Sequence, residues 1–254
     1  MMRLIVFILA CFATLFANSV VDIPTRSGVS ERINVLKSDE NPKAVAILFA
    51  GGHGGLQIGD DGKYGWGAGN FLVRSAELFV KAGLMVVVVD APSDRQKEPY
   101  LNGFRQTKEH AEDTQAVINW VKRQTNVPIW LVGTSRGTQS VASIALSDVK
   151  GIHGIVLTST ILHDTKSKAV PELDLEKLSI PVLVAHHESD GCSHCSFSLV
   201  EGLMKKLDKN PAKALIVFQG GQTKGDPCNP FGYHGFNGIE QEVVTKLSDW
   251  MLAH

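Results

Sequence analysis

The chain has 254 residues, of which 44% are hydrophobic and 20% are charged, and its formal net charge at pH 7 is −1. This composition is ordinary for a folded globular protein, and the length suits one large α/β domain or two small ones. The near-zero net charge gives no indication of binding to nucleic acid or to acidic membranes, so we expect neither as a partner.

Residues 1–19 have the layout of a secretory signal. Arg3 supplies a positive charge, Leu4–Phe16 is nearly all apolar, and Ala17–Ser19 offers small residues where a signal peptidase cuts. The apolar run is too short to cross a bilayer as a helix, which takes roughly 20 residues. We therefore expect cleavage near Ser19 and a periplasmic or secreted mature chain without a stable membrane span. An uncleaved anchor is the alternative.

Apolar runs bounded by glycines alternate with helical patterns along the rest of the chain. The runs Ala44–Ala50 and Leu84–Asp90 are apolar up to their ends, as strands buried on both faces of a sheet are. The predicted strands are Val20–Ile23, Arg32–Lys37, Ala44–Ala50, Leu84–Asp90, Pro128–Val132, Gly154–Leu157, Ile180–Ala185 and Ala214–Phe218. The predicted helices are Phe71–Ala82, His110–Arg123, Thr138–Leu146, Leu199–Leu207 and Ile239–Met251.

Alternation of strands and helices predicts an α/β fold with a mostly parallel sheet covered by helices on both faces. No linker divides the pattern, so residues 20–254 are expected to form a single domain. The segment between the strands Gly154–Leu157 and Ile180–Ala185 has room for a loop and a short helix, but for no large cap domain. Ser198 with Glu201 predicts a capping box at the start of the helix that follows. In such sheets, ligands bind beyond the carboxyl ends of the strands.

The stretch Gly133-Thr134-Ser135-Arg136-Gly137 is a G-x-S-x-G motif between a predicted strand and a predicted helix. The two glycines allow a sharp turn that lifts Ser135 above the sheet in a strained conformation. The helix that follows points its first N–H groups and the positive end of its dipole at the same place. In this context the motif predicts a nucleophilic serine, and a helix-capping turn with an incidental serine is the alternative.

A serine nucleophile needs a general base, and the base needs an acid that orients it. Asp190 follows the strand Ile180–Ala185, and His234 lies between the last predicted strand and the last predicted helix. Ser135, Asp190 and His234 thus follow one another in the order, and at the strand ends, that a serine-hydrolase triad on an α/β sheet requires.

On these features the sequence resembles the α/β-hydrolase superfamily, on its esterase and dienelactone-hydrolase side. The resemblance rests on GTSRG, on HHESD after a buried strand, on His234 before the terminal helix, and on the glycine-rich loop after Ala44–Ala50. It covers the whole predicted mature chain. It implies the α/β-hydrolase fold and acyl-transfer chemistry, and it implies no particular substrate.

Several positions keep alternatives. His194 and His187, which are close in sequence to the acid loop, rival His234 as the base. Asp164 rivals Asp190 as the acid, because some members of the superfamily place the acid one strand earlier. The oxyanion hole needs two backbone N–H donors, which we expect from Arg136 and from either Gly52 or His53. The side chain of Arg136 could either bind a charged group of the substrate or form an ion pair on the protein surface.

The predicted function is a serine hydrolase that cleaves a small-molecule carboxylic ester, lactone or thioester of modest size through an acyl-serine intermediate. We expect no cofactor and no metal. A peptidase or an acyltransferase on the same scaffold is the alternative. The pocket is expected to be walled by Tyr64, Trp66, the loop Ala91–Gln106, Phe231 and Tyr233.

The stretch His186–Cys195 reads HHESDGCSHC. Its histidines and cysteines suggest a second, less favoured hypothesis, in which the protein is a zinc or redox protein. Zinc ligands would be Cys192, His194 and Cys195 with His186 or His187. Against this alternative, structural zinc sites usually draw ligands from two separated segments, and here all of them crowd one loop.

Cys192, Cys195 and Cys228 remain after removal of the predicted signal, and export favours disulfides. If the fold is right, the loops with Asp190 and His234 leave adjacent strands, and a Cys192–Cys228 bridge would tie these loops together. Cys195–Cys228 and Cys192–Cys195 are the alternative pairings. Cys195 has no assigned role.

Overall fold

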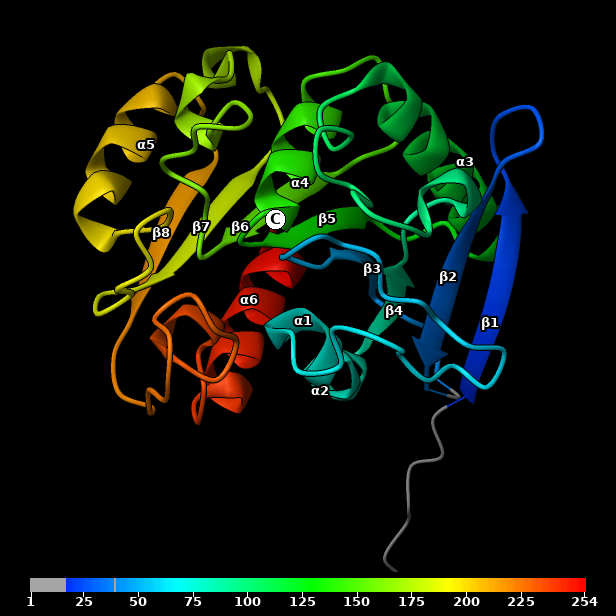
Figure 1. The fold of residues 1–254 in the computed structure, drawn as a ribbon, viewed down its shortest axis with the longest axis horizontal. Helices are drawn as coiled ribbons and strands as arrows, with labels where there is room; N and C mark the ends of the chain where they lie inside the picture. Colours follow the sequence, from blue (N-terminus) through cyan, green and yellow to red (C-terminus); the bar gives the residue numbers. More distant parts are fainter. Residues whose placement is uncertain (1–16, 39) are drawn as a thin grey trace, which may run out of the picture.

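The computed structural model describes residues 17–38 and 40–254, which form an eight-stranded sheet between two layers of helices (Figure 1). The strands are β1 (Ala17–Pro24), β2 (Ser30–Lys37), β3 (Ala44–Phe49), β4 (Leu84–Val89), β5 (Ile129–Thr134), β6 (Gly154–Thr158), β7 (Val182–His187) and β8 (Lys213–Phe218). They lie in the order β1-β2-β4-β3-β5-β6-β7-β8. β2 is antiparallel to β1 and β4, and every other neighbouring pair is parallel. The predicted mostly parallel sheet is confirmed.

The helices divide between the two faces of the sheet, as Figure 1 shows. Apolar residues of α3, α4 and α5 pack on one face, and those of α1, α2 and α6 pack on the other. The helices are α1 (Phe71–Arg74), α2 (Ala76–Lys81), α3 (Lys108–Gln124), α4 (Gly137–Ala145), α5 (Val200–Lys206) and α6 (Glu240–Ala253).

The central strands show why their sequences are apolar throughout. In β3, Val45 and Ile47 pack into the core under α3 and α4, whereas Ala46 and Leu48 pack into the core on the opposite face. Successive side chains of a strand point to opposite faces, so a strand covered on both faces needs an apolar residue at every position. β8 lies at the edge of the sheet and is less buried.

Two local predictions were wrong. The expected helix Phe71–Ala82 is interrupted at Ser75, which ends α1 and precedes α2. The expected capping box is absent, because a 3₁₀ turn shifts the first residue of α5 to Val200. Ser198 therefore lies one residue before the N-cap and shares a hydrogen bond with Ser196.

The segment between β6 and β7 contains only loops and two short 3₁₀ turns, Val170–Glu172 and Leu175–Lys177, so no large cap covers the sheet. Among the described residues, no helix combines the length and the apolar character needed to cross a membrane. The predicted signal falls mostly outside the described residues. Its last residues, Ala17–Ser19, begin β1 and pair with the end of β2.

Candidate active site

The turn between β5 and α4 holds Ser135 in the left-handed region, with a φ of 52°. A Cβ on Gly133 would lie 2.6 Å from the carbonyl oxygen of Gly137, and a Cβ on Gly137 would lie 2.0 Å from that of Phe49. Both glycines of the motif are therefore required by close backbone contacts. The Ser135 N–H donates to the carbonyl of Thr158 at 3.0 Å, which fixes the turn against β6.

Asp190 and His234 are buried and joined by a hydrogen bond of 2.9 Å from His234 Nδ1 to Asp190 Oδ2. The backbone N–H of Cys192 donates to the other carboxylate oxygen at 3.0 Å. Burial alone would raise the pKa of Asp190, but hydrogen bonds from His186 and His234 lower it to about 2. Since an ionised carboxylate is only an acceptor, it selects the His234 tautomer with hydrogen on Nδ1 and leaves Nε2 as a proton acceptor.

The long loop that carries His234 is anchored on both sides of the histidine. The Ser159 hydroxyl donates to the His234 carbonyl oxygen at 2.7 Å. A Cβ on Gly235 would lie 1.8 Å from the carbonyl oxygen of Pro230, so the chain crosses itself closely at this point. Phe236 follows with a positive φ and is buried in the core. These contacts hold the histidine in place despite the length of the loop.

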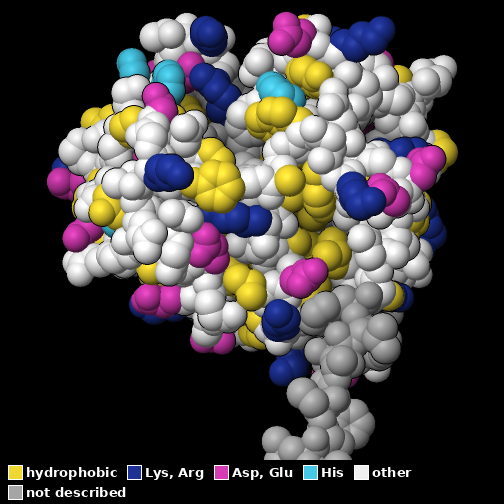
Figure 2. All heavy atoms as spheres, turned by 60° about the horizontal axis from the view of Figure 1, so that its bottom comes forward, with side chains coloured by type: hydrophobic (Ala, Val, Ile, Leu, Met, Phe, Trp, Pro, Cys, Tyr) yellow, Lys and Arg dark blue, Asp and Glu magenta, His cyan; other side chains and the backbone are white. Residues whose placement is uncertain are grey.

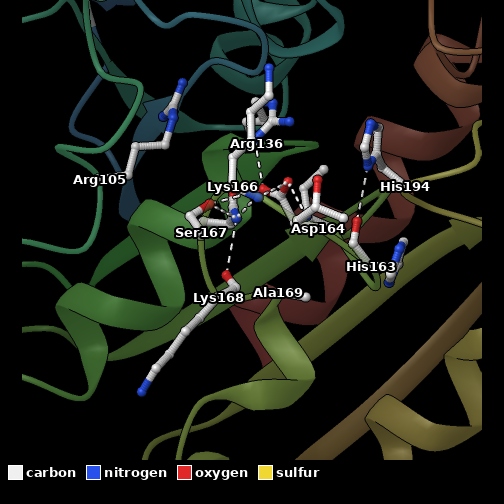
Figure 3. Close-up of polar contacts among 12 residues, drawn as sticks. Arg105, Arg136, His163, Asp164, Lys166, Ser167, Lys168, Ala169 and His194 are labelled. Atoms are coloured by element: carbon white, nitrogen blue, oxygen red, sulfur yellow. Dashed lines mark hydrogen bonds and ion pairs between the residues drawn. The ribbon is translucent and has the colours of Figure 1, made fainter.

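Asp164, the rival acid, belongs to a different network, which Figure 3 shows. Its carboxylate accepts hydrogen bonds from Arg136 at 2.8 Å, from Ser167 at 2.9 Å and from Gln139 at 3.0 Å. Burial opposes ionisation, but these bonds bring the pKa of Asp164 far below its usual range. The Arg136 guanidinium is thus an ion-pair partner of a buried carboxylate, and Asp190 is the acid that contacts His234.

The glycine-rich loop after β3 passes directly beside the serine turn. A Cβ on Gly51 would lie 3.0 Å from the Cβ of Ser135. Gly52 has a φ of 60°. In the described part of the chain, the backbone N–H groups of Gly52, His53 and Arg136 donate no hydrogen bond to another protein group. The structure therefore leaves N–H donors free in the two segments where the sequence predicted an oxyanion hole.

Arg105 was not singled out by the sequence, yet it braces this loop. The buried side chain donates to the carbonyl oxygens of Ala50 and Gly52, each at 3.1 Å, and to the Ser140 hydroxyl at 3.0 Å. Among the described residues, no carboxylate pairs with its charge. Burial and the nearby charge of Arg136 lower the pKa of Arg105 to about 9, so it stays protonated at neutral pH. No sequence signal identifies this residue, because the contact joins segments far apart in the chain.

Ser135 and His234 open into one cleft of about 430 Å³. Trp66 and Phe231 line it as predicted, whereas Tyr64 hydrogen bonds to Asn34 and Tyr233 stacks on His187. The loop 91–106 borders a separate, smaller cavity. No hydrogen bond joins Ser135 directly to His234 within the described residues. Figure 2 shows one face of the molecule, where hydrophobic side chains are exposed among charges of both signs.

The sequence matches no protein-family model and no curated protein. Solved structures do match. An esterase of Pyrococcus furiosus is 15% identical, with 93% of this chain and 91% of that chain covered and a TM-score of 0.65. A dienelactone hydrolase of Anabaena variabilis is 14% identical, with coverages of 94% and 98% and a TM-score of 0.63. A cold-adapted esterase from an Arctic intertidal metagenomic library is 18% identical, with coverages of 92% and 93% and a TM-score of 0.59.

The chain has the α/β-hydrolase fold. Identities this low establish the fold alone, so function has to be argued from the site. In this α/β-hydrolase fold, Ser135 follows β5, Asp190 follows β7 and His234 follows β8.

A disulfide joins Cys192 to Cys228, with 4.5 Å between the Cα atoms, and confirms the favoured pairing. It ties the Asp190 loop to the His234 loop of the α/β-hydrolase fold. Cys195 remains a free, buried thiol. Burial, and next the charge of Asp190, raise the pKa of the Cys195 thiol well above its usual range, while a hydrogen bond with Ser135 acts in the opposite direction.

The ligand set of the sequence-based zinc alternative is not brought together. The His194 ring bonds to the carbonyl oxygen of His163 (Figure 3), and His186 Nε2 donates to the carbonyl oxygen of Cys195. The groups that do converge are Cys192, Cys195 and His234, whose ligand atoms lie within 4.8 Å of one another. The sequence did not indicate this set, because His234 lies on a different loop.

Proposed function

We propose that the protein is a serine hydrolase that cleaves a carboxylic ester, lactone or thioester of modest size. The observation that carries this proposal is the hydrogen-bonded pair Asp190–His234, whose histidine lines the same cleft as Ser135 on its strained turn. A nucleophile, a base and an orienting acid in this order are the chemical requirements of acyl transfer through a covalent serine intermediate.

In the proposed reaction, His234 Nε2 accepts the Ser135 hydroxyl proton as Oγ attacks the substrate carbonyl carbon. The free N–H groups of Arg136 and of Gly52 or His53 stabilise the developing oxyanion. Collapse of the tetrahedral intermediate breaks the acyl–oxygen bond, or the acyl–sulfur bond of a thioester, and the leaving group takes the proton from His234. Water then attacks acyl-Ser135 with His234 as the base, which releases the acid and restores the serine.

The cleft favours small substrates with an apolar part. It has aromatic walls at Trp66 and Phe231 and backbone walls at Gly51 and Gly52, and no large cap extends over it. We favour ester cleavage over peptide cleavage or acyl transfer to a second substrate, because similar solved structures of matching length are described as esterases and a dienelactone hydrolase. The disulfide supports action outside the reducing cytoplasm.

Turnover of p-nitrophenyl esters with acyl chains of increasing length, together with labelling by a fluorophosphonate, tests the proposal. Ser135→Ala should abolish labelling and lower kcat by at least about a thousandfold, because it removes the nucleophile. Ser147→Ala, an exposed serine just beyond α4, is the matched control and should retain both properties. Labelling that survives in Ser135→Ala, or an absence of hydrolysis across the panel, would contradict the proposal.

A further inference from the structure

Four potential zinc ligands meet at the His234 end of the cleft. The sulfur atoms of Cys192 and Cys195 and a ring nitrogen of His234 lie within 4.8 Å of one another, and all three residues are buried. Cys228 adds a fourth ligand atom, because its sulfur is bonded to that of Cys192. In a tetrahedral zinc site with bonds of about 2.0–2.3 Å, neighbouring ligand atoms lie roughly 3.5–4 Å apart, so only small shifts separate this cluster from a Cys₃His site.

The disulfide is what withholds these ligands. Zinc binds thiolates, and Cys192 and Cys228 cannot supply them while they are bonded to each other. Cys228 is exposed and lines the cleft, so a reductant reaches the bridge from solvent. Cys195 is already a free thiol, and its backbone is fixed at both ends: its N–H donates to the Cys192 carbonyl, and its carbonyl accepts from His186.

The surroundings of His234 are those of a zinc-bound histidine. Its Nδ1 is hydrogen bonded to the buried carboxylate of Asp190, which leaves Nε2 as the ring atom that binds a metal. A carboxylate behind a histidine in this way orients the ring and strengthens it as a ligand.

We propose that reduction of Cys192–Cys228 converts this end of the cleft into a zinc site formed by Cys192, Cys195, Cys228 and His234. A dithiol reduces the bridge to two thiols and leaves as its own disulfide. Zn²⁺ then displaces one proton from each of the three thiols and binds the neutral imidazole. Contacts from Ser159 and Phe236 hold the His234 loop when the bridge is open.

The consequence for activity rests on the proposed function. The Nε2 atom that accepts the Ser135 proton in hydrolysis is the atom that binds zinc, so a zinc-loaded chain has no general base. A reduced chain that meets zinc is therefore held inactive. A small-molecule disulfide that accepts the two electrons, and leaves as its two thiols, would re-form Cys192–Cys228, expel the metal and restore the base.

The experiment compares zinc binding by the oxidised chain with binding by the chain reduced with dithiothreitol and then desalted without oxygen. Competition against a chromophoric chelator should give one zinc per reduced chain and none per oxidised chain. Co²⁺ in place of zinc should produce the absorption of tetrahedral thiolate coordination. Ester hydrolysis by the reduced chain should be lost on addition of one equivalent of zinc and recovered with a chelator.

Two variants make the result specific. Cys195→Ser should weaken zinc binding by the reduced chain by about a hundredfold, because it removes a ligand. His194→Ala should bind like the parent, because the His194 ring contacts His163 instead of the cluster (Figure 3). The proposal is overturned if the reduced chain binds no zinc, or if Cys195→Ser binds it as tightly as the parent. Zinc stoichiometry is measured without a substrate, so it decides this proposal even if no ester is hydrolysed.

Discussion

Arg105 is a buried cation without a carboxylate partner among the described residues, which is an expensive arrangement for a protein interior. Its hydrogen bonds to the carbonyl oxygens of Ala50 and Gly52 explain its presence. A cation on the Gly52 carbonyl polarises the Gly52–His53 peptide and strengthens the His53 N–H as a donor. The positive charge also lies on the side of the cleft where the oxyanion would develop, and burial leaves that charge poorly screened.

Replacement of Arg105 should therefore affect the chemical step more than substrate binding. We expect Arg105→Met to lower kcat by about tenfold to a hundredfold, with a smaller change in KM, since removal of one direct oxyanion donor costs about a hundredfold to a thousandfold. Arg105→Lys keeps the charge but not the fork of donors, and it should fall between the parent and the Met variant. Steady-state kinetics, with urea unfolding to monitor stability, measure this. An equal loss of kcat in both variants would contradict the role of the charge.

Glu31 in β2 is, like Arg105, a buried ionisable residue without an ion-pair partner in the described part of the chain. Among the described residues, neither of its carboxylate oxygens has a hydrogen-bond partner. Burial, and then the charges of Asp113 and Asp90, raise the pKa of Glu31 well above its ordinary 4.5. The unfolded chain ionises this group above about pH 4.5 while the folded chain keeps it protonated, so folding loses stability as the pH rises from there.

Glu31→Gln keeps the shape of the protonated side chain and cannot ionise. The variant should therefore exceed the parent in free energy of unfolding at pH 8, and the two should converge near pH 4. Urea denaturation at the two pH values is the measurement. A variant that is less stable than the parent at pH 8 would show that Glu31 is ionised and stabilising in the folded chain.

The strands were easier to predict from the sequence than the helix ends. A strand buried on both faces requires an unbroken apolar run, as β3 and β4 show. The helix ends were less predictable. Apolar spacing along the sequence did not indicate the interruption at Ser75 or the 3₁₀ turn before α5. Turn chemistry was predictable at Gly133, where the glycine requirement is local, whereas Gly137 is required by the carbonyl oxygen of Phe49 in β3.

The disulfide acts on the elements that carry Asp190 and His234. It closes a loop of 36 residues, which in the chain-entropy model stabilises the fold by about 4 kcal/mol. Replacement of both Cys192 and Cys228 by Ser should lower the free energy of unfolding by about this amount, and should lower kcat because His234 is held by fewer contacts. Denaturation and ester kinetics check both parts, with Ser147→Ala as the control that keeps the bridge. A double variant as stable as the control would contradict the prediction.

The assembly of the site needed the fold of the entire chain. Ser135, Asp190 and His234 could be chosen from the sequence because each follows a predicted strand, and parallel strands bring their carboxyl ends to one edge of the sheet. Arg105 and the convergence of Cys195 with His234 could not, because these contacts join loops whose paths no local pattern specifies. The sequence resemblance implied the fold, and the cleft walls were predicted in part.

The stability of the folded protein in acid should report on Asp190. Its folded pKa of about 2 lies below its ordinary 3.8, so it contributes about 2 kcal/mol above pH 4, and this contribution is lost as the pH falls through 2. The difference in free energy of unfolding between the parent and Asp190→Asn should therefore be largest at pH 5 and fall by about half at pH 3. Urea denaturation at intervals between these values measures it. A difference that stays constant across the range would mean that Asp190 titrates alike in the folded and unfolded chains, and that its bond to His234 does not stabilise the ionised carboxylate.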